Sequence, residues 1–199
     1  MKAVMISIQP KWVEKIASGE KTIEVRKTRP KMGTPFKCYI YCTKHKERLI
    51  EVVHKGDDMG YCVYNEDTPM FIKTFADMAL LGTNMAGKVI GEFVCDRVIE
   101  WKYLPDHTDE NEYEYYIVSK DGHDTCLTYD EIENYGQGKP LYGWNISNLK
   151  IYDKPKSLEM FPVGKIARDC GYGNYNIYDK ILTRPPQSWC YVEEQDNER

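Results

Sequence analysis

The sequence predicts an α+β fold that is mainly β, with short helices and inserted segments around the strands. Runs with strand composition recur along the 199 residues, most clearly at 3–8, 36–43, 87–101 and 141–151. Helical signals are short and few, with one helix expected to begin at Pro10 and another at Thr128. Short strands bounded by turn residues, with few helices between them, favour a mainly β architecture.

The first elements are a strand, a short helix and a glycine turn. Residues 3–8 (Ala-Val-Met-Ile-Ser-Ile) have strand composition. Pro10 suits the first turn of a helix, because it has a fixed φ and no backbone donor, and Gly19 suits the position just after the helix end. Between them, Trp12 and Ile16 are four residues apart, as are Val13 and Ala17, which gives the helix one apolar face.

A charged strand follows the glycine turn. Ile23 and Val25 lie on one of its faces, and Glu24 and Arg26 lie on the other. Lys21 stands where the turn meets the strand, so that its long side chain can reach over the same opening. An ammonium, a carboxylate and a guanidinium at one rim suit a small polar ligand or a phosphate. A solvated strand face with an ordinary surface ion pair is the alternative.

These residues carry a family resemblance. Gly19, Lys21, Glu24 and Arg26 fit the signature Gly-x-Lys-x-x-Glu-x-Arg, and Gln9-Pro10 fits the pair that often opens the preceding helix. In this respect the sequence resembles the ASCH domains of the PUA-like superfamily. The resemblance implies a PUA-like β-barrel, in which Gly19, Gln9 and Pro10 have structural roles.

The next part of the chain combines a basic loop, two strands and an insertion. Residues 27–37 must form a loop, and its Lys27, Arg29 and Lys31 can lie along a nucleic-acid backbone or simply be solvated. Strands are expected at 36–43 and 49–54, a turn at 56–60 and a short helix at 72–81. Compact ASCH domains lack so much material here, so the resemblance implies an insertion at about 57–86.

The later strands suggest how the barrel closes. Residues 87–101 predict one long bending strand, residues 106–114 an acidic connection, and Thr128 to Glu131 a capping box that opens a helix. Strand character returns at 141–151. The run Tyr-Gly-Trp-Asn-Ile at 142–146 resembles the tryptophan-bearing strand near the end of ASCH barrels. Trp144 and Asn145 are therefore candidate ligand-binding residues.

We expect two parts in the chain. Residues 1–160 are predicted to form the ASCH-like barrel with its insertion, and residues 161–199 to form a C-terminal extension that packs on the barrel. Residues 170–178 are expected to form an aromatic-rich loop whose tyrosines either stack on bases or anchor the loop, and 188–192 a last short strand.

Composition narrows the functional classes. No apolar run is long enough to span a bilayer, and the N-terminus lacks the apolar core of a signal peptide. The 7 cysteines and 4 histidines do not have the spacing of a zinc site, so no metal or cofactor is expected, and a cytoplasmic location fits thiols that stay reduced.

Charge is divided unevenly along the chain. Residues 1–55 carry 13 Lys and Arg against 5 Asp and Glu, whereas residues 56–135 carry 5 against 18. A basic patch around the motif would attract phosphate, although the charges can also spread over different faces after folding.

Three functions remain open. The ASCH resemblance implies binding of RNA, a nucleotide or a modified nucleoside beside the motif strand, with Lys21, Glu24, Arg26, Trp144 and Asn145 as contacts; Trp12 is a further stacking candidate that suits the core better. A second possibility is a hydrolase, either an acetylcytidine amidohydrolase or a ribonuclease, in which Lys21 and Glu24 would be catalytic. The acetylcytidine amidohydrolase has a threonine at the position of Glu24 and uses a separate glutamate as well. No motif places that glutamate in this sequence, and Asp124 is only a guess for it. A third possibility is a protein-interaction module whose motif is structural.

Overall fold

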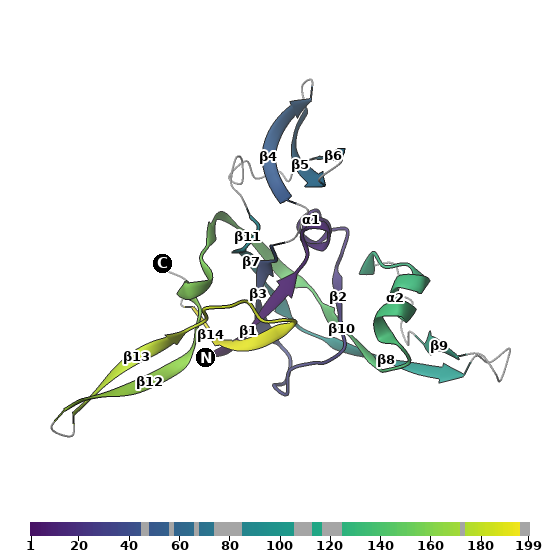
Figure 1. Cartoon of the computed structure of the whole chain (residues 1–199). Helices are drawn as coiled ribbons and strands as arrows, with labels where there is room; N and C mark the ends of the chain where they lie inside the picture. The colour runs from purple at the N-terminus through teal and green to yellow at the C-terminus, as the bar shows by residue number, and fades with distance from the viewer. Residues whose placement is uncertain are drawn as a thin grey trace. The chain divides into compact units, whose positions relative to one another are not determined.

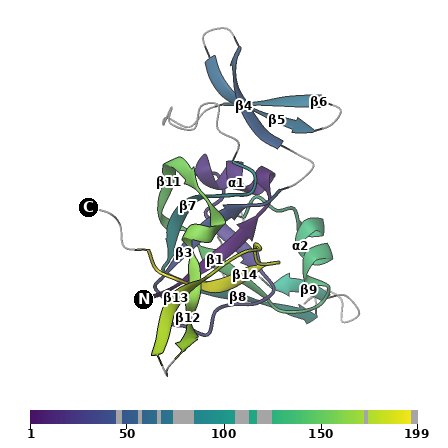
Figure 2. The same cartoon turned by 60° about the vertical axis from the view of Figure 1, so that its left-hand side comes forward.

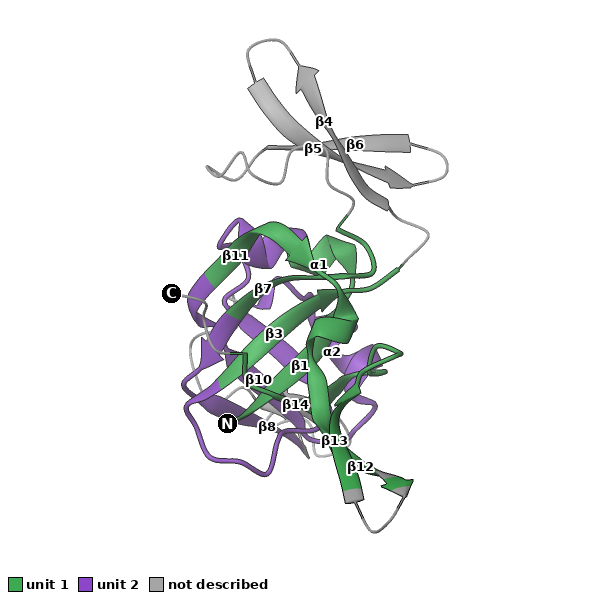
Figure 3. Ribbon diagram, turned by 90° about the vertical axis from the view of Figure 1, so that its left-hand side faces the viewer, with its two compact units in different colours: residues 1–13, 37–92, 150–199 green, residues 14–36, 93–149 purple. Residues whose placement is uncertain are grey.

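The computed structural model describes residues 1–44, 48–55, 58–65, 68–73, 85–105, 113–116, 125–171 and 174–195. In these ranges most residues of the regular elements are in strands, and two α-helices accompany them (Figure 1). The expected mainly β, α+β fold is therefore confirmed. The chain divides into two compact units, coloured separately in Figure 3, which are described one at a time below.

The first unit comprises Met1–Val13, Lys37–Glu92 and Lys150–Arg199. The strands of its main sheet are β1 (Lys2–Ile8), β3 (Phe36–Cys42), β7 (Lys88–Cys95), β11 (Ser147–Lys156) and β14 (Trp189–Glu193). They are ordered β11-β7-β3-β1-β14, with β1 parallel to β3 and antiparallel to β14. The strand expected at 188–192 thus pairs directly with the first strand of the chain, while the boundary expected at 160 stays a prediction.

Apolar side chains on this sheet form the core of the first unit. Met5, Tyr39, Val89 and Phe161 belong to one buried cluster, in which the rings of Tyr39 and Phe161 are 4.7 Å apart. At the edge of this cluster the buried Tyr152 hydroxyl donates a hydrogen bond of 2.6 Å to Glu92 Oε2. Burial is the largest cause that raises the pKa of Tyr152, and this hydrogen bond is the second largest. The hydroxyl therefore keeps its proton and remains a donor.

Two smaller sheets also belong to the first unit. The first contains β4 (Arg48–Lys55), β5 (Asp58–Asn65) and β6 (Thr68–Lys73), paired antiparallel in that order. The second is a two-stranded ribbon of β12 (Pro162–Gly171) and β13 (Asn174–Ile181), which follows the 3-10 segment η3 (Leu158–Met160) (Figure 2). Residues 74–81 of the helix expected at 72–81 lie outside the described residues, and residues 72–73 end β6.

The aromatic stretch at 170–178 corrects one expectation. Most of it is strand, because β12 extends to Gly171 and β13 begins at Asn174. The register pairs Ile166 with Tyr178 and Ala167 with Ile177, so alternating β-formers meet across the ribbon. The glycines and asparagines had suggested a loop, but cross-strand pairing with 162–171 outweighs them, and that pairing is not visible in a local window.

The second unit comprises Glu14–Phe36 and Phe93–Leu149. Its sheet contains β2 (Ile23–Arg26), β8 (Val98–Pro105), β9 (Tyr113–Tyr116) and β10 (Leu141–Asn145), in the order β2-β10-β8-β9. Helix α2 (Tyr129–Gly136) packs on this sheet through Ile132, which joins Ile23, Trp101 and Leu141 in a buried cluster. The expected capping box is present, since Thr128 accepts from the Glu131 backbone N–H and Glu131 accepts from that of Thr128.

One long strand was expected at 87–101 and strand character at 141–151, and each of these stretches is divided in the structure. Residues 87–101 form β7 and β8 with a break at Asp96 and Arg97, and residues 141–151 form β10 and part of β11 with a break at Ile146. The breaks are held by hydrogen bonds, since the Asn145 backbone N–H donates to the Arg97 carbonyl at 3.0 Å and that of Ile146 donates to Thr22 at 2.8 Å. Because apolar residues occupy both faces throughout, the sequence pattern alone contains no interruption.

Thiol reactivity is expected to follow burial. Burial raises the pKa of Cys42 and of Cys95 to about 12, whereas Cys170 is exposed. Iodoacetamide at about pH 8 should therefore alkylate Cys170 and spare Cys42 and Cys95, because alkylation requires the thiolate. Mass spectrometry of the native protein reads this pattern, and alkylation of all three at equal rates would contradict it.

The same two thiols have a consequence for stability. Their folded-state pKa lies above the ordinary value, so the folded state holds their protons at a pH where the unfolded state releases them. The contribution of these two thiols to the free energy of unfolding is fully present below the ordinary thiol pKa. It is lost as pH rises from about 9 towards 12.

Candidate functional site

The turn between α1 (Pro10–Ala17) and β2 places Lys21 at the start of the motif strand. Gly19 has a φ of +80°, in the left-handed region that favours glycine, and its N–H donates to the Ile16 carbonyl at 3.0 Å. The Lys21 backbone N–H donates to the Lys15 carbonyl at 2.9 Å. This glycine C-terminus ends the helix and leaves Lys21 directly beside β2.

The Lys21 side chain is held inside the second unit. It is only 2% exposed, and its ammonium donates to the carbonyls of Ile23 at 2.8 Å and Thr125 at 2.7 Å. The same nitrogen lies 3.4 Å from Glu24 Oε2. The sequence had suggested an arm swinging over an opening. In the structure, two carbonyl oxygens and one carboxylate oxygen lie close to the ammonium and hold it in place.

Glu24 and Arg26 complete a buried ionic cluster. Arg26 Nη2 lies 2.8 Å from Glu24 Oε1, and the two residues are 9% and 5% exposed. They lie on one face of β2, as the alternation of the strand predicts. Removing such charges from water costs several kcal/mol per ion, so their close mutual contact is required for the fold to tolerate them. We call Lys21, Glu24 and Arg26 the ionic cluster.

Strand β10 supports this cluster from the adjacent position in the sheet. Trp144 pairs with Glu24 in the register, and Tyr142 pairs with Arg26. The Trp144 side chain is fully buried and meets Phe36 edge to face, with ring centroids 5.6 Å apart. Its ring is therefore covered by protein on this side of the sheet.

Asn145, the other candidate on β10, has its own partner. Its Nδ2 donates to Asp96 Oδ1 at 2.7 Å, at the break between β7 and β8. The structure thus brings Trp144 next to the ionic cluster by register, while the Asn145 amide is turned to a structural hydrogen bond.

The remaining sequence candidates lie in other settings. The Gln9 carbonyl accepts from the backbone N–H groups of Trp12 and Val13, both at 3.0 Å, while Pro10 is buried as the first residue of α1. Trp12 is half-buried, with the Lys11 ammonium 4.3 Å from its ring centroid. These residues belong to the first unit and organise the start of the helix. Asp124 lies outside the described residues.

Around the ionic cluster, the structure adds two cation–ring pairs that sequence reasoning did not bring together. Lys27 lies 4.9 Å from the ring centroid of Tyr135 on α2, and the Arg29 guanidinium lies 5.9 Å from that of Tyr142 on β10. Both cations are exposed and both rings are half-buried. We call these four residues the tyrosine–cation rim. Only the spacing of Lys27 and Arg29 signals it in the sequence.

Tyr135 connects the rim to the ionic cluster electrostatically. Burial raises the pKa of Tyr135, which the Arg26 charge opposes and the Glu24 charge reinforces. The phenol therefore lies within the field of the Arg26–Glu24 pair and remains protonated at neutral pH.

Sequence reasoning also missed Thr125, whose backbone carbonyl accepts from the Lys21 ammonium. Side-chain patterns give no signal for a contact made by a backbone carbonyl.

No group of three or more His, Cys, Asp or Glu side chains among the described residues is arranged to hold a metal ion. Nor do the described helices include one with the length and apolar character needed to cross a bilayer.

Comparison with known proteins identifies similar structures. No protein-family model and no curated protein matches the sequence. The structure is similar to the crystal structure of ASCH from Zymomonas mobilis, with a TM-score of 0.52, 16% identity and coverage of 96% of this chain and 88% of that chain. A Tyr-to-Phe mutant of that protein gives a TM-score of 0.53, 16% identity and coverage of 98% and 92%. A Ser-to-Ala mutant gives 0.51, 15% identity and coverage of 96% and 89%. At this identity, the likeness establishes a shared fold.

Proposed function

The chain has the ASCH fold, and from this premise we propose that it binds a nucleic-acid-derived ligand against β2. The ligand classes are RNA, a nucleotide or a modified nucleoside. The observation that carries the proposal is the tyrosine–cation rim beside the ionic cluster. Exposed cations next to aromatic rings are the combination with which proteins hold single-stranded nucleic acid, because cations attract phosphates and rings stack on bases.

The roles of the residues follow from their geometry. Lys27 and Arg29 are exposed and meet phosphate oxygens, while Tyr135 and Tyr142 offer ring surface to a base. Arg26 and Glu24, just behind the rim, supply a donor and an acceptor for the edge of a base.

Lys21 and Trp144 have supporting roles in this proposal. The Lys21 ammonium already has carbonyl partners, so it holds the Glu24 carboxylate in position. The Trp144 ring is fully buried and supports β2 through the core. Asn145 contributes indirectly, by fixing the end of β10 on Asp96.

The test uses fluorescence anisotropy with a labelled short single-stranded RNA over a range of salt concentrations. Lys27→Ala/Arg29→Ala should weaken binding and reduce the slope of log K against log salt by about 1.4, the value for two lost phosphate contacts. Lys150→Ala/Lys154→Ala, which removes two exposed lysines of β11, is the matched control and should leave affinity and slope unchanged. Equal losses in both double variants, or no binding by the wild type, would overturn the proposal for RNA.

Hydrolysis is the second candidate. The contact of the Lys21 ammonium with the Glu24 carboxylate at 3.4 Å favours it, because this pairing suits proton transfer and oxyanion stabilisation. Multiple-turnover assays with acetylcytidine and with RNA distinguish catalysis from binding. Product beyond one equivalent, lost in Glu24→Gln with binding retained, supports a hydrolase. Absence of turnover with binding intact leaves the binding proposal alone.

A further inference from the structure

A cavity of ≈ 580 Å³ lies in the first unit, among residues that the proposed function does not use. Its walls come from the end of β3, the turn before β7, the η3 segment and the chain leading to β14. Pockets that hold small molecules have volumes of about 300–1,000 Å³, so this one has room for a ligand of metabolite size.

Backbone hydrogen bonds fix two of the residues that line the cavity. The Gly87 N–H donates to the Cys42 carbonyl at 2.8 Å, and the Thr43 N–H donates to that of Ile8 at 2.9 Å. Gly87 has a φ of +80°, and a Cβ at this position would lie 2.5 Å from Lys44 Cε. The Lys44 side chain therefore lies across Gly87, at the wall of the cavity, and glycine is required there.

Two cations, Lys44 and Lys88, line the cavity. No ion pair of Lys44 is found with any residue that the structure describes. Glu159 also lines it, but a hydrogen bond from its own backbone and one from Ser157 lower the pKa of this carboxyl, with a smaller effect from Lys88. The carboxylate is thus hydrogen-bonded mainly within its own turn.

A buried hydroxyl next to the cations lacks a partner. Thr43 lines the cavity, and its Oγ1 is buried without a hydrogen bond to any described residue. A buried hydroxyl without a partner costs about 1–3 kcal/mol. Because Thr43 lines the cavity, rotation about χ1 to another staggered rotamer is the movement by which this hydroxyl would reach a ligand bound there.

We propose that this cavity is a second binding site, specific for a small phosphorylated molecule. The phosphate lies against Lys44 and Lys88 and accepts from the Thr43 hydroxyl. The rest of the molecule packs on the apolar wall formed by Leu158 and Pro185. Lysine ammonium groups bind phosphate as point charges, and three phosphate oxygens match two ammonium donors and a hydroxyl.

The site is independent of the proposed function, because the cavity shares no residue with the ionic cluster or the rim. NMR titration of the ¹⁵N-labelled full chain tests it, with uridine monophosphate, inorganic phosphate and uridine as probes. Uridine monophosphate should shift the amides of residues 41–44, 86–88 and 157–159 in a saturable way, inorganic phosphate should shift a part of them, and uridine should shift none.

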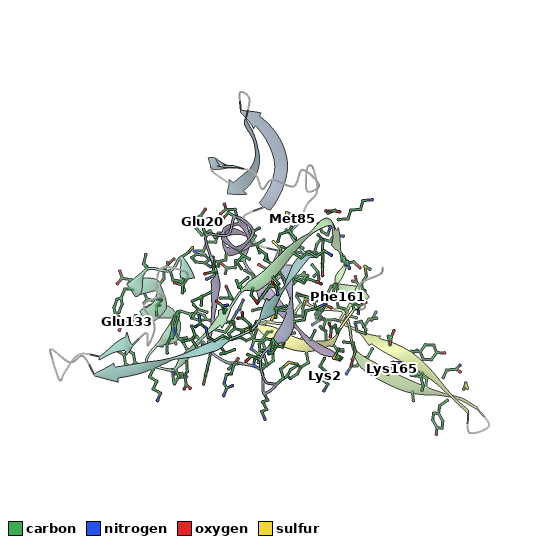
Figure 4. All side chains as sticks on the ribbon, turned by 180° about the vertical axis from the view of Figure 1, so that it is seen from behind. Lys2, Glu20, Met85, Glu133, Phe161 and Lys165 are labelled. Atoms are coloured by element: carbon green, nitrogen blue, oxygen red, sulfur yellow. The ribbon has the colours of Figure 1, made fainter. Side chains whose placement is uncertain are left out.

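Variants of lysines inside and outside the cavity distinguish binding in the cavity from binding elsewhere on the protein. Lys44→Ala should weaken binding of uridine monophosphate about fivefold, as expected for one exposed ion pair, and Lys44→Ala/Lys88→Ala should weaken it about 25-fold, because two such pairs are lost. Lys165→Ala is the matched control and should bind like the wild type, because Lys165 is an exposed lysine of β12 that does not line the cavity and lies apart from Met85, the neighbour of the lining residue Ala86 (Figure 4). Lys27→Ala/Arg29→Ala should also leave this binding unchanged.

Three results would overturn the second site. These are a titration in which the amides of residues 41–44, 86–88 and 157–159 do not shift, equal affinity of wild type and Lys44→Ala/Lys88→Ala read from these amides, and equal shifts of these amides with uridine and with uridine monophosphate. Loss of RNA binding in Lys27→Ala/Arg29→Ala with the cavity shifts intact shows that the two sites are separate.

Discussion

Replacing Glu24 with alanine is expected to lower the free energy of unfolding by about 3–5 kcal/mol. The carboxylate lies 2.8 Å from Arg26 Nη2 and 3.4 Å from Lys21 Nζ, and all three residues are at most 9% exposed. Without it, two cations remain buried with no carboxylate between them. Urea denaturation followed by circular dichroism measures the loss.

Glu100→Ala is the matched control for this prediction. Glu100 is exposed on β8, where it pairs with Tyr142 of β10, so the variant also removes a glutamate from the same sheet. Its expected effect is within about 0.5 kcal/mol, as for other surface positions. If Glu24→Ala and Glu100→Ala were equally stable, Glu24 would not hold a buried ionic cluster.

The elements that could be predicted best from the sequence are those with strong local signals. Proline at the start of α1, glycine after its end and the capping box at Thr128 each have a local physical reason, and the structure contains all three. The alternation of β2 likewise placed Glu24 and Arg26 on one face.

What could not be predicted depends on distant partners. The division of 87–101 into two strands depends on hydrogen bonds from residues around 145, and the β12–β13 ribbon depends on pairing between its strands. The burial of the Lys21 side chain depends on a hydrogen bond to the carbonyl of Thr125, which is 104 positions away in sequence. Charged residues are rarely buried, so the sequence alone favoured a more open Lys21.

The tryptophan of β10 shows how a residue chosen for one role can be assigned another. The sequence offered Trp144 as a surface on which a base stacks. Its side chain is fully buried against Phe36, directly across from Glu24 on β2. A base cannot reach this ring without opening the core, so the structure favours a supporting role.

Trp144→Ala is therefore expected to lower the free energy of unfolding by about 3–5 kcal/mol, the cost of removing a large buried aromatic side chain. The space left by the indole would lie beside Glu24, on the sheet face that carries the ionic cluster, so the cluster should lose its fixed position as well. Chemical denaturation gives the stability. Trp189→Ala is the control, because Trp189 is a half-buried tryptophan of the first unit, and it should cost less.

Trp144→Phe distinguishes support from stacking. Phenylalanine keeps an aromatic ring in the core and meets Phe36 in a similar way, so most of the stability should remain. If the tryptophan only supports β2, RNA affinity in the anisotropy assay should equal that of the wild type. If Trp144 stacks on a base, RNA affinity should fall, because an indole offers more stacking surface than a phenyl ring. The loss should be a part of the about 1–3 kcal/mol that one base–aromatic stack contributes. A folded Trp144→Phe protein with much weaker RNA binding would contradict the supporting role and place the ligand deeper than the tyrosine–cation rim.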